Sequence, residues 1–182
     1  MQKQKVQALI DKYYPKDRKV RNILTTHSSL VRDKALLIAQ LHPELNADTS
    51  ILESGAMLHD IGIIMTKAPG IDCHGTHPYI MHGVLGYELL KENGFHCIAK
   101  IAERHTGAGL SSEEILQQEL PLPVRDMLPI SIEEQIIAFA DKFFSKGHDL
   151  TREKTIHEIK NDMQGYGQQQ VIRFQTWCEQ FC

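Results

Sequence analysis

The adjacent residues His59 and Asp60 are the part of the sequence with the clearest potential for chemistry. They follow the apolar stretch 51–58 and precede Ile61-Gly62. An unpartnered carboxylate in an apolar setting carries a large desolvation cost. A bound cation would remove that cost, and imidazole and carboxylate are both common metal ligands. The pair therefore predicts a metal site, provided that other parts of the chain supply further ligands.

Four more residues of ligand type lie where a helical repeat would turn them inward. His27 shares a predicted helical face with Leu24 and Val31, and Asp141 follows Ile137 by four residues. A single histidine on an apolar face is more often a hydrogen-bonded core residue than a ligand, but an inward carboxylate needs a partner. Such a mixture suits iron, manganese, zinc or nickel, and a two-metal site with a bridging carboxylate. The candidate metal ligands are His27, His59, Asp60, His82, His105 and Asp141.

A series of helices is needed to bring these residues together. Hydrophobic periodicity predicts helices over residues 6–13, 24–42, 48–64, 78–92, 95–105 and 131–144, a short one after Ser111, and two more split around 165–167. Residues 66–77 and the proline-rich stretch 121–129 are predicted as loops, the second of which could act as a lid. No alternating strand and no internal repeat is found, so the predicted class is all-α.

Capping signals support several of these boundaries. Asp48, Thr49 or Ser50 can cap the start of the helix over 48–64, and Gly62 can end it in a left-handed conformation. Two capping boxes are predicted, the first with Ser111 and Glu114 and the second with Ser131 and Glu134.

Composition and charge exclude several other classes of protein. The chain has 182 residues and no Gly/Ser-rich linker, so we expect a single domain over 1–182, with a core at about 20–145 and C-terminal helices at 151–182 packing on it. A net charge of −3 gives no basic footprint for duplex nucleic acid or an anionic membrane. The N-terminal segment lacks the apolar region of a signal peptide, no run of eighteen apolar residues exists, and no CxxC occurs. A cytoplasmic protein with free thiols is expected.

Taken in order along the chain, these residues resemble the HD-domain superfamily of metal-dependent phosphohydrolases. The segment Leu58-His59-Asp60-Ile61-Gly62 is similar to the HDIG variant of its central motif. The resemblance covers about residues 20–145. Within it, the stretch from His105 to Asp141 is similar to a group of small, poorly characterised HDIG proteins. The further motifs that carry it are His27, His82-Gly83 with Gly86, Arg104-His105-Thr106-Gly107 and Ala140-Asp141-Lys142.

The resemblance implies a helical bundle that holds two divalent metal ions. In bimetallic relatives one metal is held by a histidine, the His-Asp pair and the last aspartate, which correspond to His27, His59, Asp60 and Asp141 here. The second takes the two later histidines, which correspond to His82 and His105, and shares Asp60 as the bridge. The resemblance therefore gives Asp60 a catalytic as well as a metal-binding role.

The resemblance also implies an activity. Two divalent cations about 3.5–4 Å apart would activate water for in-line attack on phosphorus. We expect Lys67 and Arg104 to contact the phosphate, with Lys142 as a weaker candidate, and His74 and His77 could line the pocket. Related small bimetallic enzymes cleave nucleotides or dinucleoside polyphosphates, so a small, nucleotide-like phosphoester or phosphoanhydride is the expected substrate.

Two other functions remain open on the sequence. Some HD-superfamily relatives use a di-iron centre of nearly the same ligands to oxidise C–H bonds. A non-catalytic sensor or binding module is a third possibility, although every matched ligand position is filled here. The identity of the metals, their number and the oligomeric state are not determined by the sequence.

Overall fold

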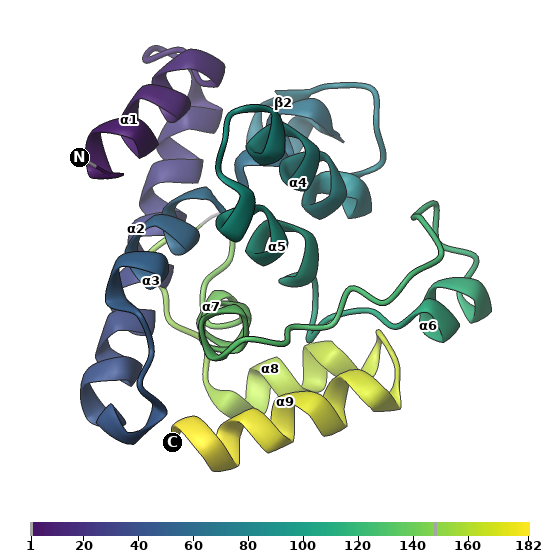
Figure 1. The fold of residues 1–182 in the computed structure, drawn as a ribbon. Helices are drawn as coiled ribbons and strands as arrows, with labels where there is room; N and C mark the ends of the chain where they lie inside the picture. The colour runs from purple at the N-terminus through teal and green to yellow at the C-terminus, as the bar shows by residue number, and fades with distance from the viewer. Residues whose placement is uncertain (1, 148) are drawn as a thin grey trace.

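A computed structural model describes residues 2–147 and 149–182 as a bundle of α-helices (Figure 1). Within this part of the chain nine α-helices and four short 3-10 helices together account for 65% of the residues, which confirms the predicted all-α class. None of these helices combines the length and hydropathy needed to cross a membrane. The helices are α1 (Gln2–Tyr13), α2 (Lys19–Leu41), α3 (Thr49–Leu58), α4 (His82–Glu92), α5 (His96–Arg104), α6 (Ser112–Gln117), α7 (Ile132–Asp141), α8 (Ile156–Gln164) and α9 (Gln168–Phe181).

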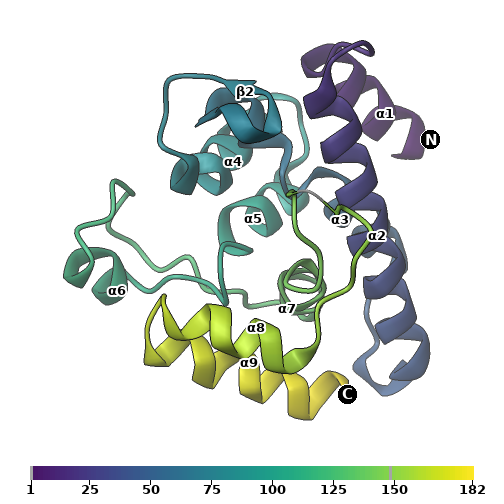
Figure 2. The same cartoon turned by 180° about the vertical axis from the view of Figure 1, so that it is seen from behind.

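Helix α7 forms the centre of the bundle. It lies between the long α2–α3 pair, the α4–α5 pair and the C-terminal α8–α9 hairpin, as the two opposite views show (Figures 1 and 2). Its residues 136–141 are all buried. The ring of Phe139 packs against Phe174 and Phe181 of α9, each with its centroid 5.3 Å away. This shared core supports our proposal that the chain forms a single domain.

The segment around the central motif differs from the predicted helix over 48–64. Asp48 caps the start of α3 as expected, since its carboxylate accepts hydrogen bonds from two backbone N–H groups. However, α3 ends at Leu58 and a 3-10 helix follows over Ile61–Met65. The tighter helix buries both Ile61 and Ile63 completely. The chain thus turns at His59 and Asp60. A helix that ended in a cap at Gly62 would have turned about two residues later.

The predicted left-handed conformation of Gly62 is wrong. Its φ is not positive, whereas that of Gly94, which ends α4 as expected, is +81°. Gly62 serves a close approach of two backbones instead. A Cβ atom at this position would lie 2.2 Å from the carbonyl oxygen of His82 and 2.4 Å from the nitrogen of Gly86. The absence of a side chain at residue 62 therefore lets α4 pack directly on the central motif.

Two other local predictions need correction. The loop over 66–77 contains a short antiparallel pair, β1 (Lys67–Ala68) and β2 (Cys73–His74), which is too short to show alternation in the sequence. The capping box at Ser111 is complete, but that at Ser131 is only half formed. The carboxylate of Glu134 accepts from the N–H of Ile130 and from Arg104 instead of closing the box.

Candidate metal centre

Three of the candidate ligands are histidines at the ends of helices. His59 follows α3, His105 follows α5, and His82 follows the 3-10 helix Tyr79–Met81. The last carbonyls of a helix lack partners within it. Each Nδ1 lies within hydrogen-bond distance of the carbonyl oxygen three residues earlier, and because a carbonyl only accepts, Nδ1–H donates and Nε2 is the ring nitrogen left to bind a metal ion. The acceptors are Ala56 at 2.7 Å, Tyr79 at 2.8 Å and Ala102 at 2.8 Å.

The structure brings all six candidate ligands together in two groups that share Asp60. Its carboxylate oxygens divide between them. Oδ2 lies 3.3 Å from His27 Nε2 and 3.2 Å from His59 Nε2, while Oδ1 lies 3.6 Å from His82 Nε2 and 3.4 Å from His105 Nε2. The first group is His27, His59, Asp60 and Asp141, and the second is Asp60, His82 and His105, with the ligand atoms of each within 4.8 Å of one another.

The chemistry of these atoms fits a cation in each group. All six side chains are buried, with at most 7% of the residue exposed. Within the described residues Asp60 Oδ1 has no hydrogen-bond partner, and Oδ2 is offset only by the Lys146 ammonium, 2.6 Å away. The Nε2 atoms of His82 and His105 are 3.1 Å apart although both Nδ1 atoms carry the hydrogens, so two lone pairs face each other. Unsatisfied acceptors and converging lone pairs are favourable where a metal ion lies between them.

The charges of the centre are strongly coupled. Burial alone would raise the pKa of Asp60, but Lys146 and His59 hold that pKa well below its usual range. Burial likewise opposes charge on His59, yet Asp60 and Asp141 raise its pKa to about 9. Burial, with the nearby His105, lowers the pKa of His82 to about 3. At neutral pH the Asp60 carboxylate and the His59 imidazole are therefore charged, and His82 is neutral.

These pKa shifts predict different pH dependences for the two groups. His59 is protonated below about pH 9, so a metal ion entering the first group must displace its proton. The affinity of that group should rise by about tenfold per pH unit between pH 6 and 8. Burial lowers the pKa of His105 as well, so both histidines of the second group are already neutral and its affinity should stay nearly constant. Calorimetric titration of manganese into metal-free protein, in buffers of different ionisation enthalpy, would measure the protons released. Equal release by both ions would contradict the prediction.

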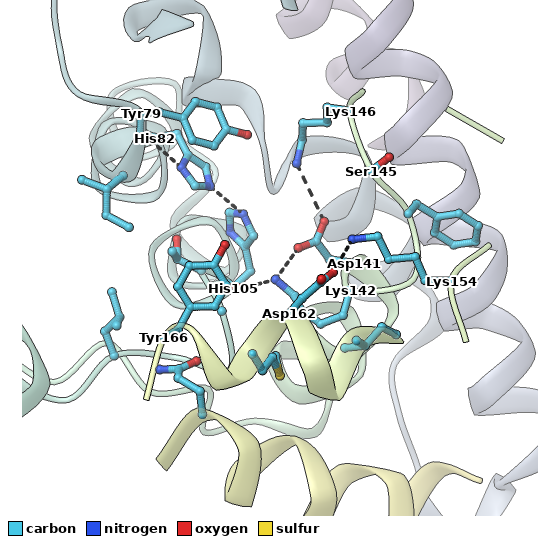
Figure 3. Close-up of a pocket in the computed structure, with 18 of the residues that line it drawn as sticks. Tyr79, His82, His105, Asp141, Lys142, Ser145, Lys146, Lys154, Asp162 and Tyr166 are labelled. Atoms are coloured by element: carbon cyan, nitrogen blue, oxygen red, sulfur yellow. Dashed lines mark hydrogen bonds and ion pairs between the residues drawn. The ribbon is translucent and has the colours of Figure 1, made fainter. Parts of the chain in front are cut away.

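A cavity of about 520 Å³ opens onto one side of the centre (Figure 3). Of the six candidate ligands, His82, His105 and Asp141 line it. Two lysines that follow α7 lie at the same place. Lys146 Nζ is 2.6 Å from Asp60 Oδ2, and Lys142 Nζ is 2.6 Å from Asp141 Oδ2. The cavity therefore combines the candidate ligands with two ammonium groups.

The structure does not bring two of the three expected phosphate-binding residues to this cavity. Arg104 points elsewhere, because neighbouring helical residues diverge by about 100° and His105 faces inward. Its Nη1 donates to both carboxylate oxygens of Glu134, at 3.1 and 2.9 Å. Lys67 is exposed in β1 and does not line the cavity. Lys142, the weaker candidate, does line it, because the helix ends at Asp141 and the chain turns there.

Two further expectations concern the loop histidines. His74 and His77 do not line the cavity, and His74 Nε2 lies 3.0 Å from an oxygen of Asp72. Sequence reasoning missed Lys146, because the helix was expected to continue to Phe144. The only sign of Lys146 in the sequence was a positive charge five positions after Asp141, which was expected to face inward. Tyr79, Lys154, Asp162 and Tyr166, which also line the cavity, carried no such signal.

Comparison with known proteins places the chain in a family. The model of the HD domain matches residues 25–145, which is more than half of the chain. This protein belongs to the HD-domain family. The match includes all six candidate ligands and all of α3, α4, α5 and α7. The fold observed here is thus the helical bundle of this family of metal-dependent phosphohydrolases.

Three curated relatives are similar to part of this HD-domain protein. One is the tRNA (cytidine(56)-2'-O)-methyltransferase of Picrophilus torridus, 35% identical over 80% of this chain and 38% of its own length. The protein of that name from Thermoplasma volcanium is 34% identical over 75% of this chain and 36% of its own length. An uncharacterized protein of Methanocaldococcus jannaschii is 44% identical over 58% of this chain and 56% of its own length.

These relatives are longer than the segment that they share with the HD-domain protein. The chain spans between 36% and 56% of the length of the three. The comparison with solved structures found no match.

Proposed function

We propose that this HD-domain protein is a metal-dependent phosphohydrolase with two metal ions, acting on a small, nucleotide-like phosphoester or phosphoanhydride. The observation that carries the proposal is the division of the Asp60 carboxylate between two groups of histidines. A carboxylate that offers one oxygen to each group is the arrangement expected of a bridging ligand. The adjacent cavity with its two lysines would receive a phosphorylated molecule.

The proposed roles follow from the positions of the residues. His27, His59, Asp60 and Asp141 would hold one ion, and Asp60, His82 and His105 the other. When bound, divalent ions supply Lewis acidity that activates water near neutral pH and offsets phosphoryl charge. Lys142 and Lys146 place two ammonium groups at the wall of the cavity, where they would attract and orient phosphoryl oxygens.

The carbonyl contacts of the histidines would keep the centre in one geometry. The Nδ1–H groups of His59, His82 and His105 are fixed to helix-end carbonyls, so each ring presents Nε2 in a set direction. Such outer contacts orient ligands and raise their basicity. His27 is different, because it lies in the middle of α2 and its Nδ1 has no hydrogen-bond partner. Its ring is held by the packing of α2 and by the contact of Nε2 with Asp141 Oδ1, at 2.9 Å.

The names of two relatives suggest another activity, methylation of a tRNA ribose. The matched segment covers less than two fifths of either methyltransferase, so the name of the whole protein does not assign that activity to the matched part. A buried cluster of histidines and aspartates also suits metal binding better than methyl transfer. An RNA partner is therefore tested as an alternative in the experiments below.

The proposal is tested by joining metal analysis to a substrate screen. Purified protein should bind two equivalents of a divalent metal and, with manganese under anaerobic conditions, release phosphate from one or more members of a panel of nucleotides and phosphoesters. Absence of turnover with every metal and substrate would contradict the proposal. Turnover that needs iron and oxygen would favour an oxygenase, and bound nucleotide without turnover would favour a sensor. Methyl transfer from S-adenosylmethionine to tRNA would favour the activity named for the relatives.

A further inference from the structure

Among the described residues, those of the candidate metal centre that reach solvent do so at the cavity. His27, His59 and Asp60 have no exposed surface and do not line the cavity, whereas His82, His105 and Asp141 do. A phosphorus atom would therefore reach the centre from the cavity. Its organic substituent would then remain in the cavity, so the walls of the cavity must determine which substituents bind.

One wall of the cavity is formed by the C-terminal hairpin. Residues of α8 and of the turn to α9 line it, namely Ile159, Asp162, Met163 and Tyr166. Figure 3 shows Tyr166 on the hairpin side of His105, with Tyr79 on the side of His82. These hairpin residues lie beyond residue 145, where the match to the HD domain ends. The wall that the hairpin forms therefore lies outside the segment that matches the HD domain.

Buried polar contacts fix the hairpin to the centre. Gln170 is 1% exposed; its Oε1 accepts from the N–H of Ala108 at 2.6 Å and its Nε2 donates to the carbonyl of Gly109 at 2.7 Å. The guanidinium of Arg173 donates to the carbonyls of Ala108 and Gly109 and to the carboxylate of Glu114. Ala108 and Gly109 belong to the turn directly after His105. The position of the hairpin is therefore coupled to that of a candidate ligand.

The walls of the cavity combine charged and apolar side chains. Lys142 and Lys146 pair with the candidate ligands Asp141 and Asp60, and the Lys154 ammonium pairs with Asp162 at 2.9 Å. Tyr166 also lines the cavity, and its 61% exposure leaves the aromatic side chain available to a ligand. The lining further includes hydroxyls, amides and apolar side chains, among them Thr106, Ser145, Gln118, Gln170, Leu110 and Leu120.

We propose that this cavity binds the nucleoside part of a nucleoside monophosphate, with Tyr166 as a specificity-determining residue that contacts the base. The assignment rests on the proposed phosphohydrolase function and names its substrate class. A volume of about 520 Å³ suits one nucleoside and cannot enclose a folded RNA. The two lysines beside the candidate ligands match the phosphate, and the apolar and aromatic side chains that also line the cavity match a planar base with polar edges.

The test compares the wild-type protein with Tyr166→Ala. Because Tyr166 is exposed, its removal should leave the fold intact. With manganese, the variant should have an about tenfold higher KM for adenosine monophosphate, and a KM for glycerol phosphate within about twofold of wild type. Equilibrium dialysis with adenosine, which lacks a phosphate, should show the same weakening without any turnover. Ile172→Ala is the matched control, since Ile172 is an exposed residue of α9 that does not line the cavity.

The outcomes separate this proposal from the proposed function. Adenosine binding that depends on Tyr166 would support the nucleoside pocket even if no phosphoester were cleaved. An equal change in KM for both substrates, or wild-type protein that hydrolyses monoesters but does not bind adenosine, would overturn the pocket and leave the phosphohydrolase function standing. Inhibition by a 5′-phosphorylated RNA at concentrations well below those of adenosine monophosphate would also overturn it, in favour of an RNA end.

Discussion

Asparagine in place of Asp60 is expected to remove both metal ions and to reduce phosphohydrolase turnover by at least about 10³-fold. Both groups of candidate ligands include this carboxylate, and asparagine keeps its shape while removing the charge. Loss of contacts that merely orient a ligand costs about 10–100-fold in metal affinity, so loss of a shared ligand should cost more. Metal content by mass spectrometry and turnover on the best substrate of the panel would measure the two effects.

The control for this variant is Asp33→Asn. The side chain of Asp33 is 64% exposed and pairs with Arg32 on the surface of α2, so its loss should leave metal content and turnover unchanged. If Asp60→Asn retained two metal ions, or lost one ion while Asp33→Asn behaved like wild type, Asp60 would not be the bridge. If it kept both ions but lost turnover, its role would be confined to the reaction.

Alanine in place of Gly62 is expected to destabilise the protein by about 2–3 kcal/mol and to weaken metal binding in the second group. The new Cβ would lie 2.2 Å from the carbonyl oxygen of His82 and 2.9 Å from the Cα of Gly86. Overpacking of this kind costs about 1–3 kcal/mol, and a change of rotamer cannot relieve it because the contacts are with backbone atoms. Helix α4 would have to move, and it begins with His82. Urea unfolding of metal-free protein would measure the stability, and titration with manganese the affinity.

Gly70→Ala provides a matched control in the same protein. A Cβ at position 70 would meet no atom within 4 Å, and its φ is not in the left-handed region. The same chemical change should therefore shift the unfolding free energy by no more than about 0.5 kcal/mol. Equal unfolding free energies for the two variants would show that the close approach of α4 to Gly62 is not required.

The sequence was informative about the ligands because buried polar residues have few alternative explanations. Asp60 and Asp141 follow apolar helical faces, where an unpaired carboxylate is costly, and both lie in the centre. The helical repeat correctly placed the histidines on inward faces. It could not show that three of them cap helix ends, since that depends on where each helix stops, and boundaries are set by tertiary packing.

The phosphate-binding residues were harder to predict because charged side chains are long and usually solvated. Adjacency to a ligand favoured Arg104, but its guanidinium pairs with Glu134 from α7, a contact between segments 30 residues apart. Lys146 reaches Asp60 across 86 positions of the sequence, and its place was hidden by an error of three residues in the end of α7. Such pairings depend on how helices pack, which local patterns do not encode.

The sequence by itself determined the all-α class, the six candidate ligands and the HD-domain resemblance, because periodicity, buried charge and motif order are local or additive properties. Only the tertiary structure decided how those ligands divide between two groups, that Lys142 and Lys146 accompany them, and that the C-terminal hairpin closes one wall of the cavity. These features arise where segments distant in the sequence meet. Their geometry follows from close packing, including the contact that Gly62 makes possible.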